Sequence, residues 1–311
     1  MGLNHDDIWG VDVRRYATST GIAHDEWSGL YGPYESNLEL RPHEMTQEFS
    51  KPILSVIIPV FNERDTIEEL LRRVLSVELQ DVRKEIIIVD DGSADGTTAW
   101  LRHQVSAPET KRGLDWRSHC GNAVTDSLKI VFHEANQGKG SALRSGFGQA
   151  SGDILLIQDA DLEYDPKDYD ALLRPIIDDE ADVVYGSRFL SPDEPAWSQF
   201  GYFGNKVITA LSNRLTGLSL TDVWTGYKVF KRPVIQQMTL LESGFELELE
   251  ITSKVAHGQW RIREVPISYS PRSREEGKKI TWQDGIKAIR AMVRYRHDLN
   301  QVRSEIMQKT H

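Results

Sequence analysis

The sequence has 311 residues, of which 39% are apolar and 27% charged, and its formal net charge is −10. These values are typical of an ordinary globular protein with one large domain or two small ones. The single cysteine, Cys120, excludes an internal disulfide framework, so a reducing cytoplasm is expected. No apolar run reaches the roughly eighteen residues of a membrane-spanning helix, and the first residues lack a signal-peptide pattern.

The charge is unevenly distributed along the chain. From Lys254 onward, thirteen Lys and Arg residues stand against six Asp and Glu residues, whereas the preceding part is strongly acidic. The C-terminal end is therefore suited to phosphate, anionic lipid or a negatively charged partner. Nucleic acid is not expected as a partner, because no nucleic-acid-binding motif is present and the main body is acidic.

Residues 1–50 carry scattered aromatic side chains without a period of two or 3.6, and we treat them as an N-terminal extension of unassigned structure. From residue 51 the hydrophobic pattern becomes regular. Apolar runs predict strands at residues 53–59, 85–89, 128–132 and 154–157, each followed by a segment with helical periodicity. The polar stretch 103–126 is predicted to be a surface insertion.

Further along, helices are predicted up to residue 177, over 203–216 and from 244, and strands over 182–185 and 260–269. Short apolar strands that alternate with helices predict an α/β domain over residues 51–270, a Rossmann-like sandwich in which helices cover both faces of a mostly parallel sheet. Residues 271–311 form a basic loop and an amphipathic helix over 282–296. That helix either meets a membrane surface or packs on the domain.

Three acidic residues follow the strand predicted at 154–157. Asp159, Asp161 and Glu163 occupy alternate positions, so in an extended segment they project to one side. Carboxylates about 4 Å apart repel one another by roughly 4 kcal/mol at an effective dielectric near 20. A hard divalent cation, Mg²⁺ or Mn²⁺, removes this conflict, and the three residues are therefore candidate metal ligands.

Other polar pairs follow other predicted strands: Asn62 and Glu63, Asp90 and Asp91, and Gly138 and Lys139. Ligands of parallel α/β sheets bind beyond the carboxyl ends of the strands. These pairs and the acidic cluster are thus expected at one rim of the sheet. The alternatives are that Glu63 is a favourable acid at a helix start, and that Asp90 and Asp91 belong to a plain turn with Gly92.

Seven segments in this order resemble the family 2 glycosyltransferases of the GT-A fold, and within them the dolichol-phosphate (polyprenyl-phosphate) mannosyltransferase branch. The segments are Ile58-Pro-Val-Phe-Asn-Glu63, Val89-Asp-Asp-Gly-Ser-Ala-Asp-Gly-Thr97, Asn136-Gln-Gly-Lys-Gly140, Asp159-Ala-Asp161, Gly186-Ser-Arg188, Thr225-Gly-Tyr-Lys228 and Glu275-Glu-Gly-Lys-Lys279. Many relatives in this branch carry transmembrane helices after the catalytic domain. Glu163 departs from the branch, which often has glutamine there.

The resemblance implies inverting transfer of a hexose of mannose or glucose type from a GDP- or UDP-linked sugar, with Mg²⁺ or Mn²⁺ as cofactor. It implies donor contacts from Pro59, Phe61, Asn62, Glu63, Asp90, Asp91, Gly138, Lys139, Asp159, Ala160 and Asp161. Asp161, Arg188 and Lys279 are the implied catalytic residues. The cation would bridge the diphosphate and stabilise the leaving nucleotide.

A polyprenyl-phosphate acceptor is already ionised and needs positioning by cations rather than a general base. The candidates are Arg188, Arg272, Arg274, Lys278 and Lys279. A lipid acceptor would place the protein at the membrane periphery or against a membrane partner. With a hydroxyl acceptor, as in polysaccharide or glycolipid synthesis, the candidate bases are Asp222, Glu246, Glu248 and Glu250.

Three other functions remain to be weighed. A dinucleotide-binding dehydrogenase fits poorly, because the third glycine of its motif would fall at Leu143. A sugar nucleotidyltransferase would open with a glycine-rich loop where Pro59, Val60 and Phe61 stand. A non-enzymatic nucleotide-sugar binder would keep the nucleotide contacts and lack turnover.

Overall fold

The structure is a computed structural model, and it describes residues 51–106, 128–191 and 199–272 together with residues 287, 290 and 294. Every described residue belongs to the unit Lys51–His311. The predicted N-terminal extension, most of the predicted insertion at 103–126 and most of the segment 271–311 lie outside the described residues.

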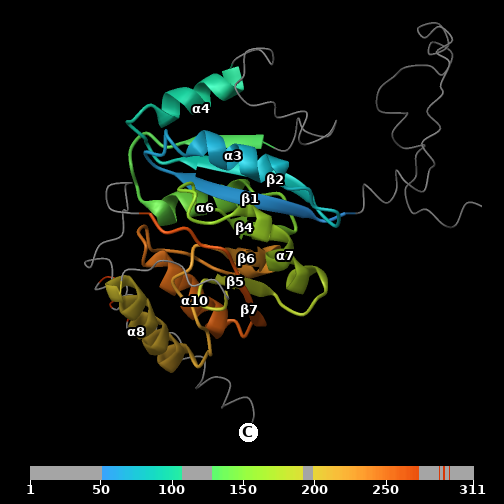
Figure 1. The fold of residues 1–311 in the computed structure, drawn as a ribbon, viewed down its shortest axis with the longest axis vertical. Helices are drawn as coiled ribbons and strands as arrows, with labels where there is room; N and C mark the ends of the chain where they lie inside the picture. The colour runs from blue at the N-terminus through green and yellow to red at the C-terminus, as the bar shows by residue number, and fades with distance from the viewer. Residues whose placement is uncertain are drawn as a thin grey trace, which may run out of the picture. The chain divides into compact units, whose positions relative to one another are not determined.

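Strands and helices alternate along the described chain (Figure 1). The strands are β1 (Ile53–Val60), β2 (Arg83–Asp90), β3 (Leu128–Phe132), β4 (Ile154–Ile157), β5 (Val183–Ser187), β6 (Lys228–Lys231) and β7 (Ile262–Pro266). The α-helices are α3 (Ile67–Ser76), α4 (Thr97–Ser106), α6 (Lys139–Gln149), α7 (Tyr169–Ile177), α8 (Gln199–Thr216), α9 (Arg232–Gln236) and α10 (Leu247–His257), and a 3-10 turn, η4 (Pro166–Asp168), precedes α7.

Most predicted elements are present, although several have different ends, and β6 and α9 were not predicted. The first residues of the predicted insertion are helical, because α4 continues to Ser106. Helix α8 begins at residue 199 rather than 203. Strand β7 is shorter than the predicted strand 260–269, since the backbone amide of Ser268 donates to the Asp168 carboxylate (2.7 Å) instead of continuing the ladder.

The strands form one sheet in the order β3-β2-β1-β4-β6-β5-β7. Neighbours are parallel except around β6, which runs antiparallel to both β4 and β5. The prediction of a mostly parallel sheet is therefore confirmed. Because β1, β2, β3 and β4 are adjacent and parallel, their carboxyl ends meet at one edge of the sheet.

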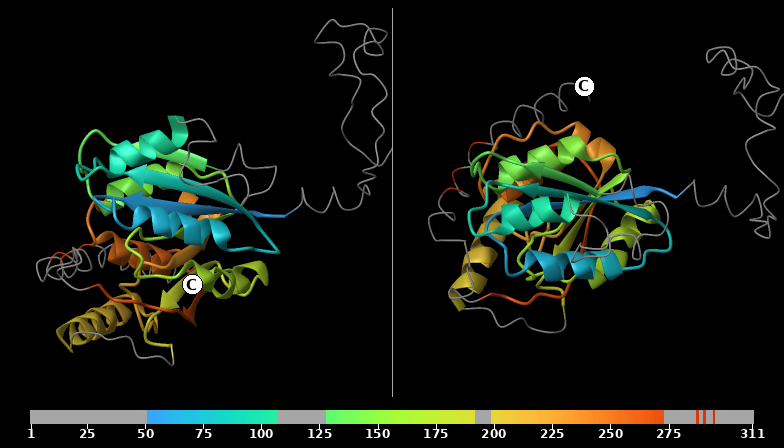
Figure 2. Two further views of the ribbon diagram at one scale, coloured as in Figure 1. Left: turned by 45° about the horizontal axis from the view of Figure 1, so that its top comes forward. Right: turned by 90° about the horizontal axis from the view of Figure 1, so that it is seen from above.

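The sheet is buried on both faces, as uninterrupted apolar strands require. Alternate residues of β1 contribute to two separate cores: Val56 and Ile58 pack with α3 and α7, whereas Ile57 packs with α6 and α10. Figure 2 shows α3 (blue) and α6 (green) on opposite sides of the strands. Each fully buried aliphatic side chain contributes about 1.5–3 kcal/mol, so the sheet is a rigid base for the loops at its edge.

Candidate functional site

The loop after β4 places Asp159 beside the first residue of α6. The Nζ of Lys139 lies 2.7 Å from Oδ1 of Asp159 and 3.1 Å from Oε1 of Glu248, which projects from α10. Burial lowers the pKa of Lys139, but the two neighbouring carboxylates outweigh it and hold that pKa above its usual value. The predicted donor-site residues Lys139 and Asp159 are thus in contact, and both come from the predicted rim.

Asp161 lies in the same acidic environment. Burial, followed by repulsion from Asp159 and Glu163, raises the pKa of its carboxyl to about 7. Ionised Asp161 is therefore poorly compensated, and a cation is the natural remedy. Glu163 is already engaged, because its two oxygens accept hydrogen bonds from the Tyr269 hydroxyl (2.9 Å) and the Arg272 backbone amide (2.9 Å).

The predicted three-carboxylate metal set is not assembled. Within the described ranges, no group of three or more His, Cys, Asp or Glu side chains is arranged to hold a metal ion. Glu163 is turned to Tyr269 and Arg272, as described above. Asp159 and Asp161 still fit a hard divalent cation, since two oxygen donors close enough to raise a pKa supply the ligands that Mg²⁺ and Mn²⁺ prefer alongside substrate phosphates.

Asp91 holds the loop that leads into α6. Its carboxylate accepts hydrogen bonds from the backbone amides of Gln137 (3.0 and 3.1 Å) and Gly138 (2.8 Å), and it contacts Nδ1 of His133 (2.6 Å). Gly138 adopts a φ of 93°, which favours glycine. This bonding gives Asp91 a loop-anchoring role, and its predicted contact with the nucleoside would have to be made in addition.

The side chains of Asp90 and Asn62, like that of Asp91, accept hydrogen bonds from loop residues at the rim. The Asp90 carboxylate accepts from the Ser93 amide (3.3 Å) and from the Thr98 hydroxyl, as in the alternative of a plain turn. The Asn62 side chain accepts from the Ala94 amide (2.8 Å). The loops after β1 and β2 are therefore bonded to each other at the rim. Two further predicted donor contacts, Pro59 and Ala160, are buried, whereas Phe61 is half-buried.

The predicted phosphate-binding Arg272 lies against the acidic loops. Its Nη2 is 2.9 Å from Oε2 of Glu63, and its Nε donates to the Asp161 carbonyl. Arg272 therefore joins the loop after β1 to the loop after β4, and it also lowers the raised pKa of Asp161 in part. Arg274, Lys278 and Lys279, which were predicted to act with Arg272, lie outside the described residues.

Arg188 is committed to a different partner. At the end of β5, its Nε and Nη2 contact Oδ2 (2.7 Å) and Oδ1 (2.8 Å) of Asp222, which is fully buried. Asp222 also accepts from the Asn205 amide (3.0 Å), which ties α8 to the pair. This bidentate pairing gives Arg188 a structural role, and the predicted contact with an acceptor phosphate would have to be made in addition. It also occupies Asp222, one of the candidate bases.

A group of buried residues, of which only Gly226 and Tyr227 belong to a sequence motif, packs beside Asp159. Gly226 packs so closely that a β-carbon there would lie 2.2 Å from Oδ2 of Asp159. The Gly226 amide donates to the Tyr164 hydroxyl (2.8 Å), and the Tyr169 and Tyr227 hydroxyls donate to Oε1 of Gln158. The only hint in the sequence was the Thr225-Gly-Tyr-Lys228 segment, because these tyrosines have the spacing of ordinary core residues.

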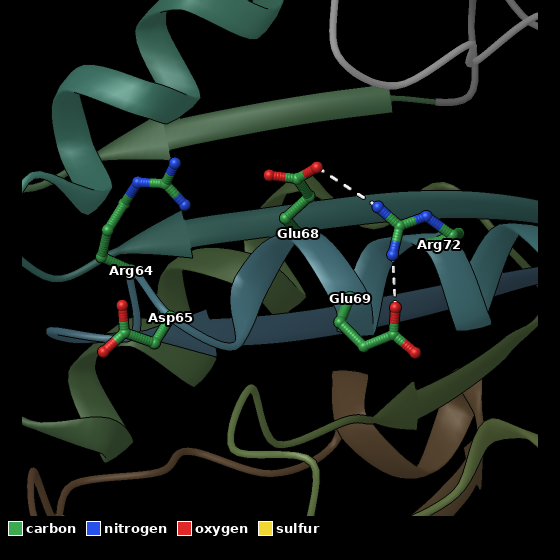
Figure 3. Close-up of a pocket in the computed structure, with 5 residues that line it drawn as sticks. All are labelled: Arg64, Asp65, Glu68, Glu69 and Arg72. Carbon is green, nitrogen blue, oxygen red and sulfur yellow. Dashed lines mark hydrogen bonds and ion pairs between the residues drawn. The ribbon is translucent and has the colours of Figure 1, made fainter.

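A hollow of about 430 Å³ lies elsewhere, on the surface of α3. It is lined by Arg64, Asp65, Glu68, Glu69 and Arg72, and Arg72 is paired with both glutamates (Figure 3). None of the predicted site residues lines it. Its three acidic and two basic side chains lie at the surface, where ion pairs contribute little, so we assign the candidate site to the strand-end loops and not to this hollow.

Comparison with known proteins extends these observations. The sequence is 28% identical over 232 residues to the dolichol-phosphate mannosyltransferase of Pyrococcus furiosus, covering 72% of this chain and 58% of that protein. It is 32% identical over 195 residues to the undecaprenyl-phosphate 4-deoxy-4-formamido-L-arabinose transferase of Sodalis glossinidius, covering 62% of this chain and 53% of that protein. The chain thus spans somewhat over half the length of these curated relatives.

Among solved structures, the glucosyl-3-phosphoglycerate synthase of Mycobacterium tuberculosis, in complex with Mn²⁺, UDP-glucose and phosphoglyceric acid, superimposes with a TM-score of 0.58 at 16% identity and covers 82% of this chain and 83% of that one. This likeness confirms the predicted GT-A fold. The sequence model described as glycosyl transferase family 2 matches residues 55–239. With the strand-end motifs and the fold in agreement with that match, the chain belongs to glycosyl transferase family 2.

Proposed function

We propose that the chain transfers a hexose, with inversion, from a nucleotide diphosphate sugar to a polyprenyl phosphate or a similar phosphate-bearing acceptor. The observation that carries this proposal is the arrangement of Asp159, Asp161 and Lys139 at the carboxyl end of β4. Two carboxylates for a divalent cation and an ammonium group for phosphate are the groups that a nucleoside diphosphate requires.

On the donor side, Asp159 and Asp161 would hold Mg²⁺ or Mn²⁺. The bound cation offsets the charge that develops on the leaving diphosphate. Lys139 is placed to add a second positive charge beside it, and the positive end of the α6 helix dipole favours phosphate as well. The loops after β1 and β2 would flank the nucleoside, and their mutual hydrogen bonds keep them in place.

On the acceptor side, a phosphate that is already ionised attacks without a general base. Arg272 contacts the acidic loops, and it begins the basic segment that also contains Arg274, Lys278 and Lys279. We propose that this segment positions the acceptor phosphate. The curated relatives named above act on dolichol phosphate and undecaprenyl phosphate by their names, which supports a lipid-linked acceptor met at the membrane periphery.

No helix among the described residues is long and apolar enough to span a bilayer. We propose that a membrane is met by a surface of this chain or through a membrane partner. Lys287, Arg290 and Arg294 are helical and exposed, as expected for the polar face of the predicted helix over 282–296. Anionic lipid headgroups attract such a basic face.

A hydroxyl acceptor is the second candidate. Of the four candidate bases, Asp222 pairs with Arg188, Glu248 with Lys139 and Lys228, and Glu250 with Lys254. Glu246 differs, because its Oε2 is one of the few buried side-chain oxygens without a hydrogen-bond partner among the described residues. If the acceptor is an alcohol, Glu246 is therefore the base to test.

The proposal is tested in two steps. GDP- and UDP-linked sugars are screened by thermal unfolding with Mn²⁺, where a ligand at 100 times its Kd stabilises by about 2.7 kcal/mol. The stabilising donor, radiolabelled in the sugar, is then offered a polyprenyl phosphate or the corresponding free alcohol. We expect one nucleotide class to stabilise the protein and the phosphate to be the acceptor.

Asp161→Asn should abolish both effects, whereas Asp170→Asn on the exposed surface of α7 is the matched control and should change neither. Transfer to the free alcohol that depends on Glu246 would replace the proposal with the second candidate. Absence of any stabilisation by nucleotide sugars would contradict both, and tight binding without turnover would leave a non-enzymatic binder.

A further inference from the structure

A row of four alternating charges runs from the rim of the sheet into the core. Asp159 contacts Lys139, Lys139 contacts Glu248, and Glu248 contacts Lys228. The two outer groups are largely buried, whereas Glu248 and Lys228 are almost fully so, with side-chain exposures of 2% and 0%. The nucleotide site described above uses only the outer pair, so the inner pair lacks an assigned role.

The inner pair is costly to maintain. Two charges removed from water each lose several kcal/mol of solvation, and a well-packed apolar pair is often as stable. Glu248 is moreover fully used, since one oxygen contacts Lys139 and the other contacts Lys228. The ammonium group of Lys228 also donates a hydrogen bond to the Thr225 carbonyl. The inner pair therefore fixes the position of Glu248 and divides its charge between Lys139 and Lys228.

Lys139 is paired with the Asp159 carboxylate, to which a divalent metal ion would also have to bind. Its Nζ is 2.7 Å from Oδ1 of Asp159, which is the distance of a direct ion pair. A divalent cation on Asp159 would repel this ammonium group at such a short distance, so metal binding would favour displacement of the lysine. After displacement, Lys139 still has Glu248 as a partner and stays beside the site.

We propose that Lys139 is a built-in counter-ion that exchanges with the divalent cation at Asp159, and that Glu248, backed by Lys228, is the positioning residue that sets this exchange. The inference rests on the proposed function, because it assumes that Asp159 binds the metal of a nucleotide site. It adds that metal entry releases an ammonium group toward the diphosphate while Glu248 limits how far that group can move.

The test measures Mn²⁺ binding to the full chain without nucleotide, by electron paramagnetic resonance of the free ion. Lys139→Met removes the competing ammonium group and should tighten Mn²⁺ binding about tenfold, whereas Glu248→Gln leaves Lys139 to Asp159 alone and should weaken it about tenfold. In the Lys139→Met background, Glu248→Gln should have less than about a twofold effect, since it acts through the lysine. UDP or GDP binding should weaken in Lys139→Met, opposite in sign to its effect on Mn²⁺.

Glu250→Gln is the matched control, because Glu250 is equally buried on the same helix and contacts Lys254 rather than Lys139. It should leave Mn²⁺ affinity unchanged even if it lowers the melting temperature. If Glu248→Gln does not fold, Lys228→Met replaces it and should tighten Mn²⁺ binding, since Glu248 is then left to Lys139 alone.

Different results would overturn the exchange between Lys139 and the metal and the proposed function on which it rests. If the wild type binds Mn²⁺ and nucleotide but Lys139→Met and Glu248→Gln shift Mn²⁺ affinity in the same direction or not at all, the exchange is overturned and the proposed function stands. If the wild type binds Mn²⁺ neither alone nor with nucleotide, both are overturned.

Discussion

Gly226 offers a direct way to disturb Asp159 without changing any charge. A β-carbon at residue 226 would lie 2.2 Å from Oδ2 of Asp159 and 3.0 Å from Cε2 of Tyr164. In Gly226→Ala, either the backbone shifts, at an overpacking cost of about 1–3 kcal/mol, or the carboxylate swings away and its 2.7 Å contact with Lys139 is lost. We expect both a lower free energy of unfolding and at least about tenfold weaker binding of the Mn²⁺ and nucleotide pair, as a displacement costing about 1.4 kcal/mol produces.

Urea unfolding followed by circular dichroism measures the first effect, and calorimetric titration of the nucleotide with Mn²⁺ present measures the second. Gly148→Ala is the matched control, because nothing lies within 4 Å of a β-carbon at that exposed position of α6. It should stabilise the protein by about 0.5–1 kcal/mol through helix propensity and leave binding unchanged. Wild-type stability together with wild-type affinity in Gly226→Ala would refute the close packing under Asp159.

Three further outcomes are expected. In metal-free protein, the free energy of unfolding should fall as the pH rises from about 4 through about 7, because the folded-state pKa of Asp161 lies above its unfolded value. The total loss should be at most about 4 kcal/mol, and Asp161→Asn should remove it. Urea titrations in which the wild type shows no dependence on pH would contradict this assignment. Arg188→Ala should cost about 3–5 kcal/mol of unfolding free energy by leaving the buried Asp222 charge unpaired, and an additional Asp222→Ala change should recover part of it; a cost below about 1 kcal/mol would show that the pair is solvated. Arg72→Ala in the α3 hollow should change stability by less than about 1 kcal/mol and leave nucleotide binding unaltered, so a loss of binding there would move the site to α3.

The motifs at the strand ends were correctly predicted to be neighbours, but the partners that individual side chains have within the protein were not predicted. The carboxylate of Asp91 binds the amides of Gln137 and Gly138. The guanidinium of Arg188 is paired with Asp222. In each case the partner comes from a segment more than thirty residues away, and no local pattern reports such a distance.

Glu248 is a further residue whose partners the sequence does not reveal. Its position in the run Glu246, Glu248 and Glu250 is compatible with a helix surface, and the sequence treats the three acids alike. The structure separates them, because Glu248 meets two lysines and Glu250 meets Lys254 and the amides of the preceding loop, whereas one oxygen of Glu246 has no partner among the described residues.

The sequence alone determined the alternation of buried strands and helices, the parallel sheet and the rim on which the polar motifs gather, because hydrophobic periodicity and the geometry of parallel strands are local or general properties. Only the tertiary structure decided which carboxylate meets which cation. Charges interact through space over a few ångströms, and the packing of α6 and α10 around β4 and β6 brings Asp159, Lys139, Glu248 and Lys228 into one row although the chain separates them by up to 109 residues.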